Sequence, residues 1–156
     1  VISGMDTSKF TYLGFVPQIN KLRNNFLEQV VFSKETQIIF ESPKRIKKLL
    51  EELLLLIPLR RVAIIRELTK RNEEVFRGSI EIVHKEFVAR SNIKGEITIV
   101  IESSGLKKDD NFNKQEISAL INLYNKKIKD KDIVSKLSKK LKVSKRTIYQ
   151  IIIENK

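Results

Sequence analysis

The chain of 156 residues holds 31 Lys and Arg against 19 Asp and Glu, a net charge of +12 with its one histidine neutral. That length suits one domain, or one domain with a small module, and a hydrophobic fraction of 41% excludes a wholly disordered chain. The absence of cysteine excludes disulfides, thiolate metal sites and cysteine nucleophiles, and the longest apolar run, residues 53–57, is too short to span a membrane.

The apolar pattern near the start of the chain predicts a helix, a strand and a second helix. Over residues 20–32 the apolar side chains recur at the spacing of one helix face. Residues 36–40, TQIIF, form a short run of β-formers between charges, which is typical of a buried strand. The next helix is expected to start after Ser42, whose hydroxyl suits an N-cap, with Pro43 at its first position, and to stop before Pro58.

Further strands are expected between residues 60 and 102. Residues 61–68, RVAIIREL, have a continuously apolar centre, typical of a strand covered on both faces. Residues 95–102, GEITIVIE, have the alternation of a strand, with Ile97, Ile99 and Ile101 on one face. Between them we expect a short strand over residues 73–77 and a helix capped by Ser79 that ends near Ala89. Strands that alternate with helices indicate an α/β fold.

A polar, glycine-containing stretch over residues 103–111 marks the expected domain boundary, which divides the chain into residues 1–104 and 105–156. Beyond it, three apolar stripes predict three helices, built on Ile117, Leu120, Ile121 and Tyr124, on Ile133, Val134, Leu137 and Leu141, and on Ile148, Ile151 and Ile152.

Residues 137–149, LSKKLKVSKRTIY, are similar to a helix-turn-helix motif in which Ser144 caps the second helix. Two positions depart from the usual pattern, because Ser138 and Lys142 stand where a small residue and a glycine are common. A plain three-helix bundle is the alternative, and a fold alone does not assign a function.

The positive charge is concentrated in this tail. Up to residue 106 the chain has 17 basic and 13 acidic residues, and from residue 107 onward it has 14 and 6. We expect the tail to contact RNA phosphates through Lys139, Lys140, Lys145 and Arg146. The alternative is a lysine-rich composition that only keeps a helix surface solvated.

Two polar segments directly follow predicted strands, where α/β sheets commonly bind ligands. They are ESPKR at residues 41–45 and RELTKRNEE at residues 66–74. For the first segment the alternative is a capped helix start, which leaves Glu41 and Arg45 unexplained. For the second segment it is an exposed turn with surface ion pairs. No glycine-rich phosphate loop occurs, and His84 is expected to be a packing or surface residue.

Four segments together resemble the C-terminal half of the bacterial 16S rRNA (cytidine-2'-O)-methyltransferases, which belong to the tetrapyrrole-methylase, or class III, methyltransferases. They are LGFVP at 13–17, IIFESPKR at 38–45, VAIIRELTKRNEEVFRG at 62–78 and GEITIVIE at 95–102. The resemblance covers residues 1–102, and the tail is similar, more loosely, to the small helical domain of that family.

The resemblance implies a C-terminal α/β sandwich domain of a class III methyltransferase, followed by a small all-α, helix-turn-helix-like module. It implies methyl transfer from S-adenosylmethionine to the ribose 2'-hydroxyl of a cytidine in 16S rRNA of the small ribosomal subunit. Val1 is not an initiator Met and residues 1–10 do not form a signal peptide, so we expect either that the protein was processed or that an N-terminal part is missing from this sequence. The resemblance implies that an N-terminal cofactor domain precedes Val1, and this fragment alone is therefore expected to be inactive. A cytoplasmic location follows from the substrate, and a homodimer is compatible with the resemblance.

The resemblance also suggests roles for particular residues. Four would touch the cofactor: Phe40, Glu41, Glu96 and Ile97. The substrate side would be lined by Arg45, Arg66, Glu67, Thr69 and Lys70. Its three cations would hold phosphates or stabilise a developing alkoxide, and Glu67 is the candidate general base. No metal is expected.

Two other functions fit parts of the sequence. The first is a helix-turn-helix regulator that binds nucleic acid and uses its α/β part for sensing or dimerisation. The second is a tetrapyrrole-biosynthesis methylase, which fits the superfamily but does not account for the basic tail, ESP-x-R or RELTK.

Overall fold

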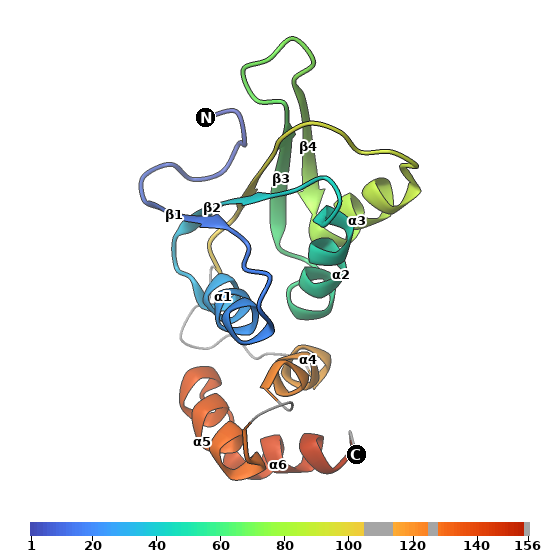
Figure 1. Ribbon diagram of the computed structural model, residues 1–156. Helices are drawn as coiled ribbons and strands as arrows, with labels where there is room; N and C mark the ends of the chain where they lie inside the picture. The colour runs from blue at the N-terminus through green and yellow to red at the C-terminus, as the bar shows by residue number, and fades with distance from the viewer. Residues whose placement is uncertain (105–113, 125–127, 155–156) are drawn as a thin grey trace. The chain divides into compact units, whose positions relative to one another are not determined.

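The computed structural model describes residues 1–104, 114–124 and 128–154 (Figure 1). The chain divides into two compact units, Val1–Leu106 and Lys107–Lys156. Most of the boundary expected at residues 103–111 lies outside the described residues.

The first unit is built on a mixed five-stranded sheet in the order β1-β2-β5-β3-β4. β1 pairs with β2 in parallel, and the other neighbours are antiparallel. The strands are β1 (Phe10–Phe15), β2 (Thr36–Glu41), β3 (Arg61–Arg66), β4 (Glu74–Ser79) and β5 (Ile97–Ile101). The helices are α1 (Asn20–Phe32), α2 (Ile46–Leu56) and α3 (Ile80–Ala89), so the predicted α/β class is confirmed.

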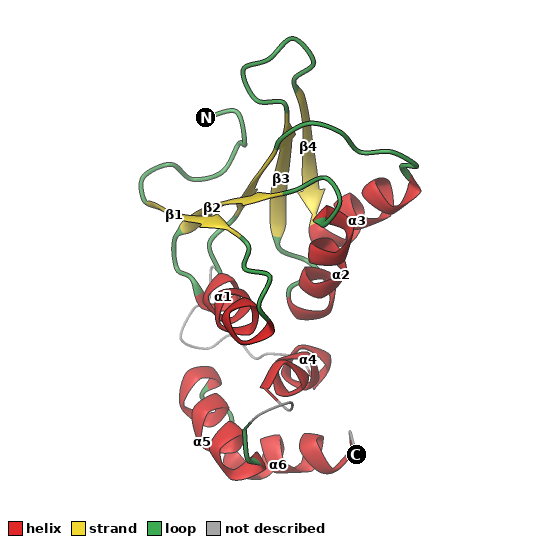
Figure 2. Cartoon of the chain, viewed as in Figure 1, coloured by secondary structure: helices red, strands yellow, loops and turns green. Residues whose placement is uncertain are grey.

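The two faces of the sheet are covered differently (Figure 2). On one face the Gln37 side chain donates to the Val30 carbonyl of α1, and the ring of Phe76 meets Phe87 of α3, so the helices cover this face. On the other face Met5 of the N-terminal segment packs against Ala63 and neighbouring apolar side chains. As predicted, residues 62–65 of β3 are buried throughout, because both faces are covered there.

One expectation about this unit was wrong, and one strand was not expected. Ser42 does not cap α2, because its hydroxyl accepts a hydrogen bond from Arg45 Nε, and Pro43 precedes the helix, which begins at Ile46. β1 was not expected at all. Its exposed and half-buried positions do not alternate simply, because the register with β2 shifts between Tyr12 and Gly14 and Gly14 takes a φ of +73°.

The second unit contains α4 (Lys114–Tyr124), α5 (Asp130–Leu141) and α6 (Lys145–Glu154). All the residues of the three predicted apolar stripes are buried. The tight turn between α5 and α6 forms without glycine, because Lys142 itself adopts a φ of +54°. The predicted cap is confirmed, since the Thr147 amide donates to Ser144 Oγ at 3.1 Å.

Candidate functional site

The sheet topology brings the two polar segments to one edge. β2 and β3 both run antiparallel to β5, which lies between them, so their carboxyl ends point the same way. Glu41 at the end of β2 and Arg66 at the end of β3 are both paired with Ile97, the first residue of β5. The loops that follow β2 and β3 therefore leave the sheet on either side of Glu96 and Ile97, and we call this end of the sheet the site edge.

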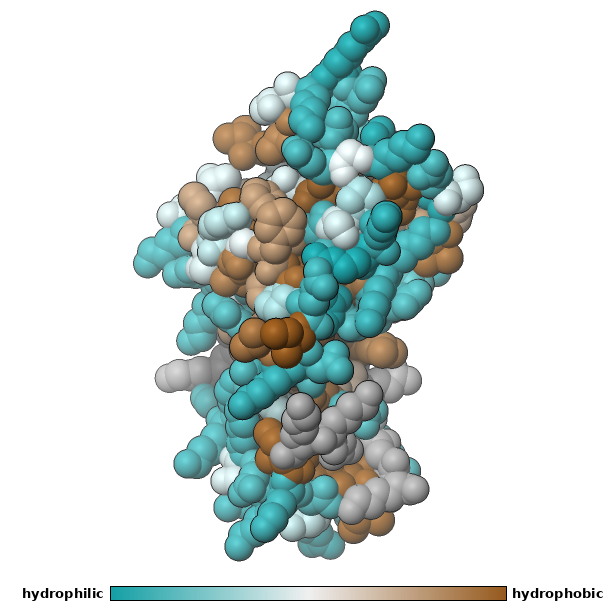
Figure 3. Space-filling model, viewed as in Figure 1, coloured by the Kyte–Doolittle hydropathy of each residue, from teal (hydrophilic) through white to brown (hydrophobic). Residues whose placement is uncertain are grey.

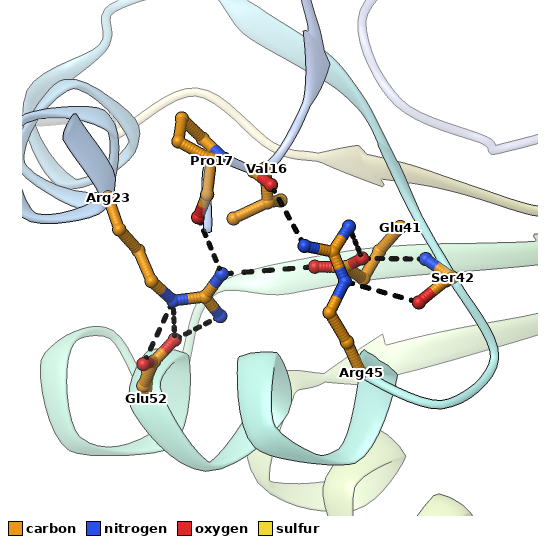
Figure 4. Close-up of polar contacts among 7 residues, drawn as sticks. All are labelled: Val16, Pro17, Arg23, Glu41, Ser42, Arg45 and Glu52. Carbon is orange, nitrogen blue, oxygen red and sulfur yellow. Dashed lines mark hydrogen bonds and ion pairs between the residues drawn. The ribbon is translucent and has the colours of Figure 1, made fainter. Parts of the chain in front are cut away.

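A buried ion-pair network fixes the loop after β2 (Figure 4). Its members are Arg23 of α1, Glu41 of β2, Arg45 before α2, and Glu52 of α2. Arg23 binds Glu52 with both Nε and Nη2, at 2.6–3.0 Å, and its Nη1 donates to the Pro17 carbonyl at 3.1 Å. The Glu41 side chain is fully buried, with Oε1 at 2.6 Å from Arg45 and Oε2 at 3.9 Å from Arg23.

The network determines what the loop can present to a ligand. Glu41 Oε1 also accepts the Ser42 amide at 2.6 Å, while Arg45 reaches Ser42 Oγ and the Val16 carbonyl. The Arg45 side chain remains 28% exposed, so it is held in place and still accessible. Glu41 is inaccessible, so its carboxylate acts on the site by orienting Arg45 and the Ser42 backbone.

A second cluster joins the loop after β3 to the start of β5. The Glu67 amide donates to the Glu96 carbonyl at 2.9 Å, and the Glu96 amide donates back to Glu67 Oε1 at 2.8 Å. Lys70 Nζ lies 3.2 Å from Glu67 Oε1 and 3.0 Å from Glu96 Oε2. Lys70 is therefore a cation on the exposed side of the site edge, oriented by two carboxylates.

The electrostatics of this cluster favour its charged forms. The Glu96 amide, followed by Lys70, lowers the pKa of Glu67, and hydrogen bonds to Glu96 and then to Glu67 raise the pKa of Lys70. A carboxylate with a lowered pKa is a weaker proton acceptor than an ordinary glutamate.

The loop that carries the cluster has an unusual backbone. Glu67 and Thr69 take φ values of +55° and +64°, in the left-handed region that costs non-glycine residues free energy. The Thr69 amide donates to Glu73 Oε2 at 2.7 Å, and the Lys70 amide donates to the Glu67 carbonyl. Such strain persists only where surrounding contacts hold it, and it is concentrated at functional sites.

Arg66 points away from the exposed cluster into a third set of ion pairs. Its Nε donates to Glu74 Oε2 at 2.9 Å, and Arg90 binds both oxygens of the same carboxylate, at 2.9 and 3.1 Å. The Arg90 guanidinium also lies 4.1 Å from the ring centre of Phe76. The hydrogen bond from Arg90, aided by Arg66, lowers the pKa of Glu74 from 4.5 to about 2.

We expect Glu74 to make the stability of this unit depend on pH. Because its pKa is depressed in the folded state, its stabilising contribution is complete above pH 4.5 and is lost as the pH falls toward 2. The contribution is on the order of 1–2 kcal/mol, reduced by solvent screening because a third of the side chain is exposed. Urea unfolding at a series of pH values checks this. Glu74→Gln should flatten the acid slope, whereas Glu81→Gln, at the exposed pair with Lys85, should change it little.

The structure gathers most of the predicted site residues at the site edge and separates others. Three of them, Glu67, Lys70 and Glu96, lie within one connected set of contacts, whereas the Arg66 side chain pairs with Glu74. The Ile97 side chain is buried, and Phe40 lies on the sheet face opposite the helices, against Tyr12 and Phe15. The expected RNA-binding residues Lys139, Lys140, Lys145 and Arg146 are all exposed, in the helical unit.

Sequence reasoning missed Arg23, Glu52, Arg90 and Gly95. One signal was available for Arg23, because it falls on the same helix face as Phe26, Leu27 and Val30, where a charged side chain needs a partner. The Glu86–Arg90 spacing is a local signal for Arg90, but it does not predict the bidentate pair with Glu74, and no local pattern marks the role of Gly95. In the described part of the chain, no group of three or more His, Cys, Asp and Glu residues is arranged to hold a metal ion. Nor is any described helix long and apolar enough to cross a membrane.

Comparison with known proteins gives consistent matches. The family of tetrapyrrole (corrin/porphyrin) methylases matches residues 4–83. Ribosomal RNA small subunit methyltransferase I of Halalkalibacterium halodurans is 41% identical over 108 residues, which cover 69% of this chain and 37% of that protein. The protein of the same name from Streptococcus pyogenes serotype M3 is 29% identical over 154 residues, 96% of this chain and 53% of that protein. The chain thus spans about half the length of these relatives or less.

Among solved structures, the crystal structure of the methyltransferase CobJ matches 70% of this chain and 47% of that chain. Its TM-score is 0.49 and its sequence identity is 12%.

Proposed function

Because the chain belongs to the tetrapyrrole methylase family, we propose that it takes part in methyl transfer from S-adenosylmethionine to 16S rRNA of the small ribosomal subunit. The acceptor we propose is the ribose 2'-hydroxyl of a cytidine, in the cytoplasm. The observation that supports this most directly is the site edge, where the loops after β2 and β3 each present an oriented cation. Arg45 is held by Glu41, and Lys70 is held by Glu67 and Glu96. The relatives are named as ribosomal RNA small subunit methyltransferases, which supports ribosomal RNA as the substrate.

The residues of the site edge suit one wall of a cofactor site. When bound, S-adenosylmethionine supplies a methyl group on a positively charged sulfur. Phe40 offers a half-buried aromatic ring, and the Glu96 carboxylate is 81% exposed beside the sheet end. Glu41 and Ile97 are buried, so they would contribute backbone groups and shape rather than side-chain contacts. We propose this wall as the part of the cofactor site that these residues form.

On the substrate side we propose that Arg45, Lys70 and Thr69 hold the RNA backbone and the reacting ribose. An in-line transfer needs the ribose oxygen aligned with the sulfur–methyl bond, and positioning of this kind accelerates reactions strongly. Lys70 can stabilise negative charge that develops on the ribose oxygen. We keep Glu67 as the candidate proton acceptor. Because its pKa is lowered, it is a weak base, and we propose that positioning of the ribose accelerates the reaction more than proton removal by Glu67 does.

The test uses the complete gene product, radioactive S-adenosylmethionine and small ribosomal subunits that lack the methyl group. We expect label in 16S rRNA at a linkage that resists alkali, because a 2'-O-methylated ribose cannot attack the neighbouring phosphate. Lys70→Ala should slow labelling by about 10²-fold, as expected when one charge-stabilising donor is lost. Lys85→Ala, at an exposed helix pair, is the matched control and should leave the rate unchanged. Unlabelled rRNA with the unaltered protein would overturn the proposal.

We propose that the helical unit supplies RNA affinity. Lys145 and Arg146 are at the start of α6, where the positive end of the helix dipole also favours phosphates, and Lys139 and Lys140 are in the last turn of α5. A regulator with an α/β sensing unit is disfavoured, because the methylase family match falls within that unit.

We expect reversal of these four charges to weaken RNA binding and to flatten its salt dependence. Replacing Lys139, Lys140, Lys145 and Arg146 by glutamate should reduce the slope of log K against log salt by up to about 4, since each phosphate contact contributes about one unit. Fluorescence anisotropy with an RNA hairpin at several salt concentrations measures this. A matched control reverses four exposed lysines of the sheet unit, Lys21, Lys34, Lys48 and Lys85. Equal losses in both variants would mean that only net charge matters.

A further inference from the structure

A cluster of aromatic rings stands on the sheet face opposite the helices, next to the site edge. Tyr12 and Phe15 of β1 both meet Phe40 of β2 edge to face, at ring-centre distances of 5.3 and 5.4 Å. We call the rings of Tyr12 and Phe15, which rest on Phe40, the aromatic platform. Tyr12 is 56% exposed and Phe15 is 64% exposed, which is unusual for such large side chains. Figure 3 shows tan and brown side chains at the surface in the region of β1.

The platform is exposed because the N-terminal segment covers only the neighbouring part of this face. Met5 fills the middle of the face, against Ala63, Ile65 and Val100. Thr36 Oγ1 donates to the Asp6 carbonyl and so ties that segment down at the other end of β2. The rings lie beyond this cover.

The rings are also held in place before any partner arrives. The Val16 amide donates to the Phe40 carbonyl at 3.2 Å, so Phe15 and Phe40 are fixed on neighbouring backbones. Each β1 ring contacts the Phe40 ring, and edge-to-face contacts of this kind are favourable. A flat partner that stacks here therefore requires little ordering of the side chains.

We propose that the aromatic platform stacks unpaired bases of the RNA substrate, an inference that rests on the proposed function and names a binding surface beside the site edge. Exposed aromatic rings on a sheet surface are a common means of binding single-stranded RNA, because every base has a flat π-face. Exposed cations lie near the rings in the sequence: Lys9 directly precedes β1, and Lys44 lies four positions after Phe40. Arg45 also reaches the Val16 carbonyl, next to Phe15. Each nucleotide of single-stranded RNA carries one flat base and one charged phosphate. Bases stacked on the rings would therefore leave phosphates to pair with these cations.

The test measures binding of the full 156-residue chain to two fluorescein-labelled probes by anisotropy. One probe is a single-stranded decauridylate, and the other is an abasic strand with the same number of phosphates. We expect the decauridylate to bind at least about fivefold more tightly, as expected for one stacked base. Tyr12→Leu with Phe15→Leu should remove that difference and leave binding of the abasic strand unchanged. Leu55→Ala, which truncates a 68% exposed side chain on α2, should leave both affinities unchanged.

Several outcomes would overturn the inference. If the unaltered chain bound the two probes with equal affinity, the inference would fail without any variant, so misfolding of a variant cannot hide that failure. The inference would also fail if the double variant kept the preference for the decauridylate. A change in molecular mass by light scattering, with unchanged RNA binding, would show that the rings join copies of the chain. The anisotropy experiment measures RNA binding and not methyl transfer. A failure of the labelling experiment therefore does not change the binding result, and a failure of the binding experiment does not change the labelling result.

Discussion

Replacing Arg23 by alanine should lower the free energy of unfolding of the protein by about 3 kcal/mol. The Arg23 side chain is only 7% exposed, and it connects Glu52, Glu41 and the Pro17 carbonyl. Its loss leaves the fully buried Glu41 carboxylate with one arginine instead of two. A buried charge that loses its partner destabilises a protein by about 3–5 kcal/mol, and the remaining contact with Arg45 places the expected effect at the lower end.

Urea unfolding of the full chain at neutral pH measures this loss. Arg61→Ala is the matched control, because it removes an arginine whose pair with Glu102 is exposed, and it should cost less than about 1 kcal/mol. A double variant, Arg23→Met with Glu41→Met, should recover much of the stability, because apolar groups can replace a buried pair at little cost. If Arg23→Ala cost no more than Arg61→Ala, the network would not behave as a buried one.

The same network explains why an arginine and a glutamate follow the β2 strand. A capped helix start would account for Ser42 and Pro43 but not for Glu41 and Arg45. In the structure Glu41 accepts the Ser42 amide and pairs with Arg45, so the polar residues hold one another and the helix starts three residues after Pro43. The stretch is thus a rigid loop that presents Arg45, and the function we propose needs that property.

Local patterns were enough to predict most elements of the fold. The helix expected over residues 20–32 has the bounds of α1, and the spacing of Ile97, Ile99 and Ile101 on one face identifies β5. The strand expected over residues 61–68 ends earlier, at Arg66, because Glu67 turns into the left-handed region. These elements could be predicted because their signals, apolar spacing and capping residues, lie within a few positions of one another.

Long-range pairing could not be predicted in the same way. That β5 lies between β2 and β3, and that Glu41 and Arg66 share Ile97 as a partner, depends on the order of strands in the sheet. The sequence nevertheless placed ESPKR and RELTKRNEE after two strands, and because these strands run in the same direction the two segments share an edge. Arg23 and Arg90 were missed because each forms its shortest ion pair, with Glu52 and Glu74 respectively, across at least 16 positions of sequence.

Replacing Gly95 by alanine should destabilise the protein by about 2–4 kcal/mol. Gly95 takes a φ of +92°, which L side chains rarely adopt, and an added Cβ would lie 2.4 Å from Glu67 Oε1 and 2.6 Å from its Cδ. The Glu67 side chain lies against this backbone because its carboxylate accepts the Glu96 amide. The methyl group would therefore push Glu67 out of position and disturb Lys70 with it. Urea unfolding measures the cost.

Two comparisons separate the clash from the backbone strain. Gly4→Ala has a similar φ, +71°, but its Cβ would come no closer than 3.9 Å to Arg77, so only the strain of about 1–2 kcal/mol should appear. In a Glu67→Ala background the clashing atoms are absent, so Gly95→Ala should cost at least about 1 kcal/mol less than in the unaltered chain. Equal costs in the two backgrounds would show that Glu67 moves aside freely. If Gly95→Ala costs less in the Glu67→Ala background, Gly95 is the residue that lets the Glu67 carboxylate lie against the start of β5, with Lys70 held beside it.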